Sequence, residues 1–250
     1  MLIYGKNPAF EALKSARLPV QAIYIQKEAD PAFADKIRAY AAPFDIKPVP
    51  KEKKELDKLA KSQNHQGIVL STGEYDYQDF EDLLGEINNN KLVRKQTRIL
   101  IAAGLNDPHN LGALARSALG SSFDGIILPE HGSVKVNETV IKSSAGAILS
   151  LNVCIVKNLT RAMKSLKDAG LWIYGLDLEG ECYCETDLTG DIALVVGSEE
   201  KGMPRLVREN CDRLLTIPTD SRLESLNASV AAGIVMFETL RQQSAAEKIQ

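Results

Sequence analysis

The chain has 250 residues, of which 44% are hydrophobic and 25% are charged, and its formal net charge is −3. This balance is typical of a globular protein with one large domain or two small ones, which can fold without disulfides or a structural metal. No run of about 18 apolar residues is present, which argues against a transmembrane helix. The first residues lack the basic-then-apolar order of a signal peptide, so we expect a cytoplasmic location. The four cysteines form no C-x-x-C pair, which favours free thiols over a metal site.

Charge is distributed unevenly along the chain. Residues 1–70 contain 12 Lys and Arg against 8 Asp and Glu, a net charge of +4, whereas residues 71–90 contain six acidic residues and no Lys or Arg. Residues 91–250 contain 18 basic and 19 acidic residues. A mildly basic N-terminal part can meet a phosphate backbone, although an ordinary solvated surface explains the same numbers.

The first 70 residues alternate short helical and strand-like runs. The pattern predicts helices over 7–15, 31–41 and 51–61 and strands over 21–26 and 67–70. This is a small α/β module of about the minimum size that folds alone. The polar and acidic stretch that follows has a helical middle over 77–87 and is interpreted as a linker. The predicted domains are therefore 1–72, a linker over 73–97, and 98–250.

From Arg98 the pattern changes to a longer alternation of strands and helices. Compact apolar runs predict strands over 99–103, 125–128, 152–156, 171–176, 192–196 and 214–217. Helices are predicted over 111–119, 136–148, 159–169, 204–210 and 226–243. Continuous apolar strands that alternate with helices indicate a doubly wound α/β domain around a parallel sheet.

Ligands of such sheets bind just beyond the carboxyl ends of the strands, where three segments hold most of the special residues. In the first, Asp107-Pro108 makes a turn, Asn110 is predicted to cap the next helix, and Arg116 projects from that otherwise apolar helix. An arginine in this place needs an anion or acceptor partner. A structural ion pair is an equally good interpretation of Arg116.

The other two segments are a glycine-flanked turn and a polar loop. Gly197 and Gly202 flank the charged turn Ser198-Glu199-Glu200-Lys201, which matches neither a Walker motif nor G-x-G-x-x-G. In the third segment a strand ends at Ile217, and a polar loop leads to a long apolar helix that Ser225 or Asn227 would cap. Taken alone, this third segment is better explained as a capped core helix.

Taken together, the three segments resemble the SpoU-type, or TrmH-like, RNA ribose 2′-O-methyltransferases of the SPOUT superfamily. The resemblance is ordered and spans about residues 98–243: Asp107–Gly112 with Arg116 is similar to the first motif, and Gly197–Met203 to the second. Ile217-Pro218 and the run from Ser225 to Val230 are similar to the third motif, and 142–147 also fits. Near the N-terminus, residues 4–8 and 65–68 resemble the small substrate-binding domain that often precedes the catalytic one.

The resemblance implies a parallel-sheet catalytic domain with a C-terminal trefoil knot, a homodimer, and S-adenosylmethionine as the methyl donor without a metal. It implies that Gly197, Ile217 and Leu226 line the cofactor pocket. The residues that it places around the reaction centre, in the catalytic group, are Asn110, Arg116, Glu199, Ser225 and Asn227. The nearest branch methylates a guanosine of 23S rRNA. Because a protein arginine keeps its proton, we interpret Arg116 as binding the target phosphate and orienting the hydroxyl, rather than as a base.

The sequence alone leaves three other functions to be considered. The chain is also compatible with a tRNA methyltransferase of the same family, or with a non-catalytic RNA-binding relative. The intact Asn110, Arg116, Glu199 and Asn227 argue against the second of these. A nucleotide-binding oxidoreductase is disfavoured because the dinucleotide fingerprint is missing.

Overall fold

The fold was analysed in a computed structural model that describes residues 1–15, 17–61, 64–93 and 96–247. Contacts between residues divide the chain into unit 1, which is Met1–Asp76 with Val136–Ser150, and unit 2, which is Tyr77–Lys135 with Leu151–Gln250. The domain boundaries expected from the sequence stay a prediction, and residues 94–95 of the expected linker lie outside the described ranges. No helix in the described part of the chain is long and apolar enough to cross a membrane.

Unit 1 is built on a mixed four-stranded sheet in the order β1-β4-β2-β3, in which only β2 and β3 run parallel. Its elements are β1 (Leu2–Tyr4), α1 (Lys6–Lys14), β2 (Val20–Gln26), α2 (Pro31–Ala41), η1 (Ala42–Phe44), β3 (Val49–Lys51), α3 (Lys53–Ala60), β4 (Ile68–Thr72), α6 (Glu138–Ser143) and η2 (Ala147–Ser150). Helix α2 begins after Asp30, whose carboxylate accepts a hydrogen bond from Phe33 N at 3.0 Å. Helix α3 packs its apolar side on Val69 of β4.

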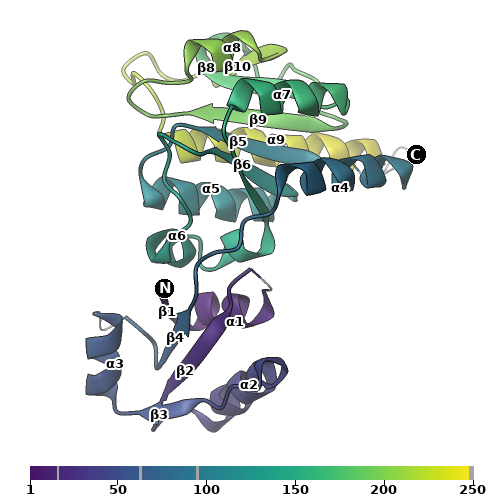
Figure 1. The fold of residues 1–250 in the computed structure, drawn as a ribbon. Helices are drawn as coiled ribbons and strands as arrows, with labels where there is room; N and C mark the ends of the chain where they lie inside the picture. Colours follow the sequence, from purple (N-terminus) through teal and green to yellow (C-terminus); the bar gives the residue numbers. More distant parts are fainter. Residues whose placement is uncertain (16, 62–63, 94–95, 248–250) are drawn as a thin grey trace. The chain divides into compact units, whose positions relative to one another are not determined.

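Unit 2 holds a six-stranded parallel sheet in the order β10-β8-β9-β5-β6-β7, which confirms the predicted α/β class (Figure 1). The strands are β5 (Arg98–Ala103), β6 (Gly125–Pro129), β7 (Asn152–Val156), β8 (Trp172–Cys182), β9 (Ile192–Gly197) and β10 (Arg213–Thr216). The helices are α4 (Phe80–Leu92), α5 (Pro108–Gly120), α7 (Leu159–Asp168), α8 (Arg205–Glu209) and α9 (Ala228–Glu247). The C-terminal trefoil knot stays a prediction.

Helices cover both faces of this sheet, which explains why its central strands, such as β9, are almost continuously apolar. Alternate residues of β5 and β9, such as Ile99 and Val195, form one core with α4, α7 and α8. On the opposite face α9 contacts β9 and packs along α5 (Figure 1). A parallel sheet covered in this way buries both sides of each strand and leaves the carboxyl ends of the strands for a ligand site.

Most predicted elements differ from the structure by a few residues at their ends, and two differ more strongly. The helix expected over 136–148 is broken into α6 and η2, because Ala145 and Gly146 have φ angles of 53° and 90°. A right-handed helix cannot continue through such angles. Strand β8 runs to Cys182, beyond the expected end at Leu176, and strands β1 and β3 were not predicted.

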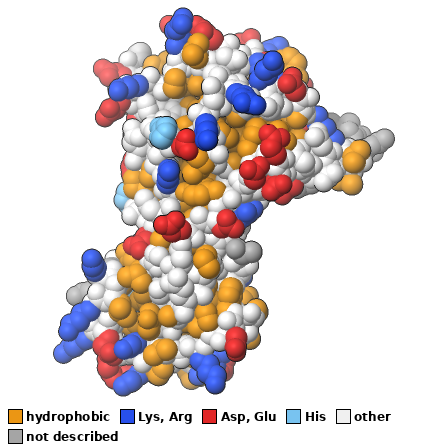
Figure 2. All heavy atoms as spheres, in the orientation of Figure 1, with side chains coloured by type: hydrophobic (Ala, Val, Ile, Leu, Met, Phe, Trp, Pro, Cys, Tyr) orange, Lys and Arg blue, Asp and Glu red, His pale blue; other side chains and the backbone are white. Residues whose placement is uncertain are grey.

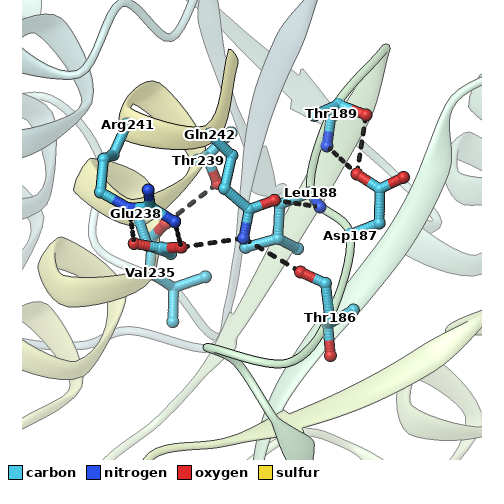
Figure 3. A network of polar contacts seen from close by, with 9 residues as sticks. All are labelled: Thr186, Asp187, Leu188, Thr189, Val235, Glu238, Thr239, Arg241 and Gln242. Atoms are coloured by element: carbon cyan, nitrogen blue, oxygen red, sulfur yellow. Dashed lines mark hydrogen bonds and ion pairs between the residues drawn. The ribbon is translucent and has the colours of Figure 1, made fainter. Parts of the chain in front are cut away.

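Two adjacent glutamines fix the C-terminal half of α9 to the loop between β8 and β9, and Figure 3 shows the contacts of the first, Gln242. Gln242 Nε2 donates to Thr186 O at 3.0 Å, and Gln242 Oε1 accepts from Leu188 N at 2.8 Å. Gln243 Nε2 donates to Gly190 O at 3.0 Å. Both amides therefore satisfy backbone groups that would otherwise be costly to leave unpaired in the interior.

A carboxylate in the same network makes stability depend on pH. Hydrogen bonds from Arg241 at 2.7 Å and from Gln242 at 2.9 Å hold the pKa of Glu238 below its ordinary value of 4.5. Because the pKa is lowered in the folded protein, this stabilisation is present above pH 4.5 and is lost as the pH falls through the folded-state pKa. We expect Glu238→Gln to lower the urea midpoint at pH 7 and to bring it closer to that of the wild type at pH 3.

The matched control is Glu209→Gln, which removes a carboxylate that pairs with Arg205 on exposed α8. This substitution is expected to change the midpoint little at either pH, because exposed ion pairs stabilise proteins weakly. A Glu238→Gln midpoint that differs from wild type by the same amount at pH 7 and pH 3 would contradict the prediction.

Candidate functional site

A cavity of about 550 Å³ lies at the carboxyl ends of β9 and β10 and against the middle of β8 in unit 2. Its walls come from the middle of β8, the loop after β9, the loop after β10 and the first turn of α9. Gly197, Ile217 and Leu226, which were predicted to line one pocket, all line this cavity, together with Glu199 and Ser225. The second and third sequence motifs therefore form a single site in the fold.

The loop after β9 is a closed turn that depends on a glycine. Ser198 N donates to Gly202 O at 3.0 Å, and Gly202 N donates back to Ser198 O at 2.9 Å. A Cβ atom on Gly197 would lie 2.3 Å from Gly202 C and 2.4 Å from Met203 N, closer than real contacts allow. Only glycine at position 197 therefore lets the turn fold back onto its own strand while it faces the cavity.

Asn227 joins the third motif to the other two. Its Oδ1 accepts hydrogen bonds from Ser229 N at 2.9 Å, Ser229 Oγ at 2.6 Å and Val230 N at 3.2 Å, so Asn227 is the one of the two predicted residues that caps α9. With the oxygen occupied in this way, the amide nitrogen must point to the other side. There Nδ2 donates to Asn110 Oδ1 at 3.1 Å and also to Glu199 Oε1.

Asn110 has a different local role from the one predicted. Helix α5 begins at Pro108 and is capped by Asp107, whose Oδ1 accepts from His109 N at 2.8 Å. The prediction that Asn110 caps this helix is therefore wrong, because the Asp-Pro pair starts the helix earlier. The buried Asn110 side chain lies inside the first turn and is free to accept the hydrogen bond from Asn227.

The wall formed by β8 was not predicted from the sequence. Asp177 and Glu179 line the cavity, and Arg208 donates to Asp177 Oδ2 at 2.9 Å and to Glu179 Oε2 at 3.2 Å. Burial raises the pKa of Asp177, but the hydrogen bonds from Arg208 and the backbone outweigh burial and hold it below its usual 3.8. The sequence did contain a signal for this wall. Leucines alternate with Asp177 and Glu179 beyond the predicted strand end, and such alternation is typical of a strand that continues with one face polar.

The cavity wall is acidic. Asp177, Glu179, Glu199, Glu200 and Glu224 line it, and the only basic side chain among the residues that line it is that of Lys201. An acidic wall favours a ligand that carries positive charge. Within the described residues no group of three or more His, Cys, Asp and Glu side chains is arranged to hold a metal ion.

Arg116 is the one predicted site residue that the structure does not bring into this cluster. It lies on α5, does not line the cavity, and its side chain is exposed. It follows Asn110 by six residues, which corresponds to about 9 Å along the helix axis. Among the residues that the structure describes, no carboxylate pairs with its guanidinium, so the structural ion pair is not formed between them.

Family models match both parts of the chain. Residues 97–237 match the SpoU rRNA Methylase family, and residues 2–78 match the RNA 2′-O ribose methyltransferase substrate-binding family. The first match covers all three motif segments described above.

Sequence relatives extend over the full length of the chain. An "Uncharacterized tRNA/rRNA methyltransferase" of Mycolicibacterium vanbaalenii is 38% identical over 249 residues, which is 98% of this chain and 77% of the relative. A Staphylococcus saprophyticus protein whose name places it among TrmH family tRNA/rRNA methyltransferases is 37% identical, over 98% of this chain and 96% of the relative.

Solved structures show a similar fold. The SpoU methyltransferase AviRb of Streptomyces viridochromogenes, in complex with its cofactor AdoMet, superposes with a TM-score of 0.78 at 22% identity, over 98% of this chain and 91% of that one. An AdoMet-bound rRNA methyltransferase of Sinorhizobium meliloti also gives a TM-score of 0.78, at 19% identity, over 96% and 86% of the two chains. Sequence and fold lead to the same result: the chain belongs to the SpoU rRNA methylase family.

Proposed function

We propose that the protein transfers a methyl group from S-adenosylmethionine to a ribose 2′-hydroxyl of RNA, at a guanosine of 23S rRNA. The observation that carries the proposal is the convergence of the three motif segments: two line one cavity, and Asn227 bonds the first motif to them through Asn110. Membership of the SpoU rRNA methylase family makes the protein a methyltransferase. The choice of a guanosine of 23S rRNA rests on the resemblance of the motifs to that branch.

The cavity fits the cofactor in size and charge. Its volume of about 550 Å³ falls within the roughly 300–1,000 Å³ of small-molecule and cofactor sites. S-adenosylmethionine carries a sulfonium and an ammonium group, which suit the acidic wall that includes Glu199 and Glu224. In this proposal Gly197, Ile217 and Leu226, which line the cavity, hold the adenine through backbone groups. When bound, the sulfonium supplies an activated methyl group, so no metal is required.

In the proposed reaction the residues around Asn227 would hold the acceptor ribose. The oxygen of Asn110 and one carboxylate oxygen of Glu199 are bonded to Asn227, which leaves the amide nitrogen of Asn110 and the second oxygen of Glu199 for the ribose. Ser225 Oγ, on the exposed loop, is a further donor. Arg116 binds the phosphate next to the target and orients the hydroxyl. This alignment replaces a random encounter by a fixed geometry.

The proposal is tested with radioactive methyl donor and two RNA substrates, 23S rRNA and bulk tRNA, from cells that lack the enzyme. We expect label in 23S rRNA only, in dinucleotides that survive alkali. Alkali cleaves RNA through the 2′-hydroxyl, so 2′-O-methylation protects the adjacent bond. Label in alkali-sensitive nucleotides would refute ribose methylation, and label in tRNA alone would refute the choice of 23S rRNA.

We also propose that the protein is a homodimer that uses the outer face of α5 and α9. Leu119 on α5 and Val230 and Phe237 on α9 are large apolar side chains with 41%, 51% and 49% of their surface exposed. Phe237 lies against the end of α5, where its Cζ would be 3.3 Å from a Cβ on Gly120. Large apolar side chains that gather on one face favour a partner surface.

We expect Phe237→Glu to give a monomer in analytical ultracentrifugation at concentrations where the wild type sediments as a dimer. A buried carboxylate in an apolar interface has no partner and opposes association. The matched control is Leu206→Glu, which places the same charge on exposed α8 and is expected to leave the dimer intact. Equal sedimentation of the Phe237→Glu variant and the wild type would contradict the use of this face.

A further inference from the structure

The contacts between lysine ammonium groups and aromatic rings that the structure describes are concentrated in unit 1. All four contacts lie in unit 1, and three of them join a residue of α1 to a residue of α2. Lys6 Nζ is 4.6 Å from the centre of the Phe33 ring, and Lys36 Nζ is 4.5 Å from that of Phe10. Such contacts normally occur about once per 70–80 residues, so unit 1 contains more of them than its length predicts.

Helical spacing explains how the six side chains form one surface. Lys6, Phe10 and Lys14 are four residues apart on α1, and Phe33, Lys36 and Tyr40 are three and four apart on α2, so each helix presents them as one stripe. The stripes meet where the Phe10 ring centre lies 5.7 Å from those of both Phe33 and Tyr40. We call these six residues the aromatic–lysine surface.

The charges of this surface are only partly neutralised. Lys14 pairs with Glu11 at 2.9 Å, whereas Lys6 and Lys36 have no carboxylate partner among the residues that the structure describes. All three lysines are exposed, and Phe10 and Tyr40 are half-buried. On the face of the molecule seen in Figure 2, Lys and Arg side chains border apolar areas of unit 1. The surface thus combines positive charge with accessible ring edges.

We propose that the aromatic–lysine surface binds unpaired nucleotides of the RNA substrate, with bases against Phe10 and Tyr40 and phosphates on Lys6 and Lys36. The inference rests on the proposed function, because that function supplies RNA as the ligand. Rings that stack on bases, interleaved with cations that track the backbone, are what single-stranded nucleic acid requires. A lysine that lies over a ring can turn to a phosphate and open the ring face to a base.

The charge part of the proposal is tested by fluorescence anisotropy with the full chain and a labelled single-stranded RNA of about ten nucleotides. We expect Lys6→Gln with Lys36→Gln to weaken binding roughly tenfold at low salt and to reduce the slope against log salt by about 1.4, or 0.7 per lost phosphate contact. The matched control, Lys53→Gln with Lys54→Gln, removes the same charge from exposed positions on α3. Equal losses from the two pairs, or no loss from the first pair, would overturn the proposal.

The stacking part is tested with Tyr40. We expect Tyr40→Leu to weaken binding of the single strand by about 5- to 100-fold and to change binding of the same sequence as a duplex little, because paired bases do not offer their faces. Tyr40→Phe keeps the ring and is expected to bind as the wild type does. Thermal unfolding confirms that each variant is folded. A folded Tyr40→Leu variant that binds the single strand normally, or loses the duplex equally, would refute stacking.

Failure of this inference is distinguishable from failure of the proposed function. If the surface is wrong and the function is right, the Lys6→Gln, Lys36→Gln variant methylates 23S rRNA with the KM of the wild type. If the function itself is wrong, the wild type yields no alkali-stable methyl label, whatever its affinity for RNA.

Discussion

Replacing Gly197 by alanine is expected to weaken binding of S-adenosylmethionine by at least about tenfold, or about 1.4 kcal/mol. The added Cβ would lie within 2.6 Å of Gly202 C, Gly202 O and Met203 N, all backbone atoms that cannot turn aside. The turn would have to open, which breaks the pair of hydrogen bonds between Ser198 and Gly202. Glu199, inside this turn, would then move away from Asn227.

Isothermal titration calorimetry with S-adenosylmethionine measures the effect, and thermal unfolding shows whether the variant stays folded. Overpacking against backbone costs about 1–3 kcal/mol of stability, which a domain of this size is expected to survive. The matched control is Gly85→Ala on α4, where nothing beyond the adjacent residues and the helix's own backbone lies within 4 Å of the new Cβ. It should bind normally and gain a few tenths to about 1 kcal/mol of stability. Normal cofactor affinity in Gly197→Ala would show that the turn does not shape the site.

The fold of unit 2 could be predicted because its signals are local. Runs such as Ile192–Val196 are apolar on every residue, and only a strand covered on both faces needs such a run. The break between α6 and η2 could not be predicted, because it depends on packing within unit 1. A Cβ on Gly146 would lie 2.7 Å from Glu11 Cβ, so the chain turns there to pass α1. Strand β3 is three residues long and contains Pro50, which weakens its sequence signal.

The sequence predicted the loops of the candidate site, but it did not predict the wall that β8 forms. The loops stand out because they come after predicted strands, where parallel sheets bind ligands. The family resemblance, not strand position, pointed to Gly197, Ile217 and Leu226, all of which line the cavity. The acidic side chains of β8 lie in the part of the strand beyond Leu176, where apolar residues no longer mark it. Asn110 shows a further limit: an asparagine near a helix start is usually a cap, and only the fold reveals that its partner is Asn227.

Replacing Arg116 by alanine is expected to lower kcat by at least about 100-fold while the affinity for S-adenosylmethionine stays unchanged. The guanidinium does not line the cofactor cavity, so its loss should not disturb cofactor binding. An arginine in a protein keeps its proton, so in the proposed function Arg116 holds the target phosphate and thereby the hydroxyl. Single-turnover methylation of 23S rRNA and calorimetry with the cofactor measure the two effects separately.

Two further variants show whether the loss of activity in Arg116→Ala depends on the position of the arginine or on its charge. Arg161→Ala on α7 removes an arginine that is also exposed and has no carboxylate partner in the described structure, and it should leave kcat unchanged. Arg116→Lys keeps the positive charge but loses the planar fork that binds two phosphate oxygens, so we expect intermediate activity. Because a positioned phosphate does not titrate near neutrality, the residual activity of Arg116→Lys should follow the same pH profile as the wild type. A profile that shifts to the lower pKa of lysine would instead assign the proton transfer itself to residue 116, and normal turnover in Arg116→Ala would remove this side chain from the reaction.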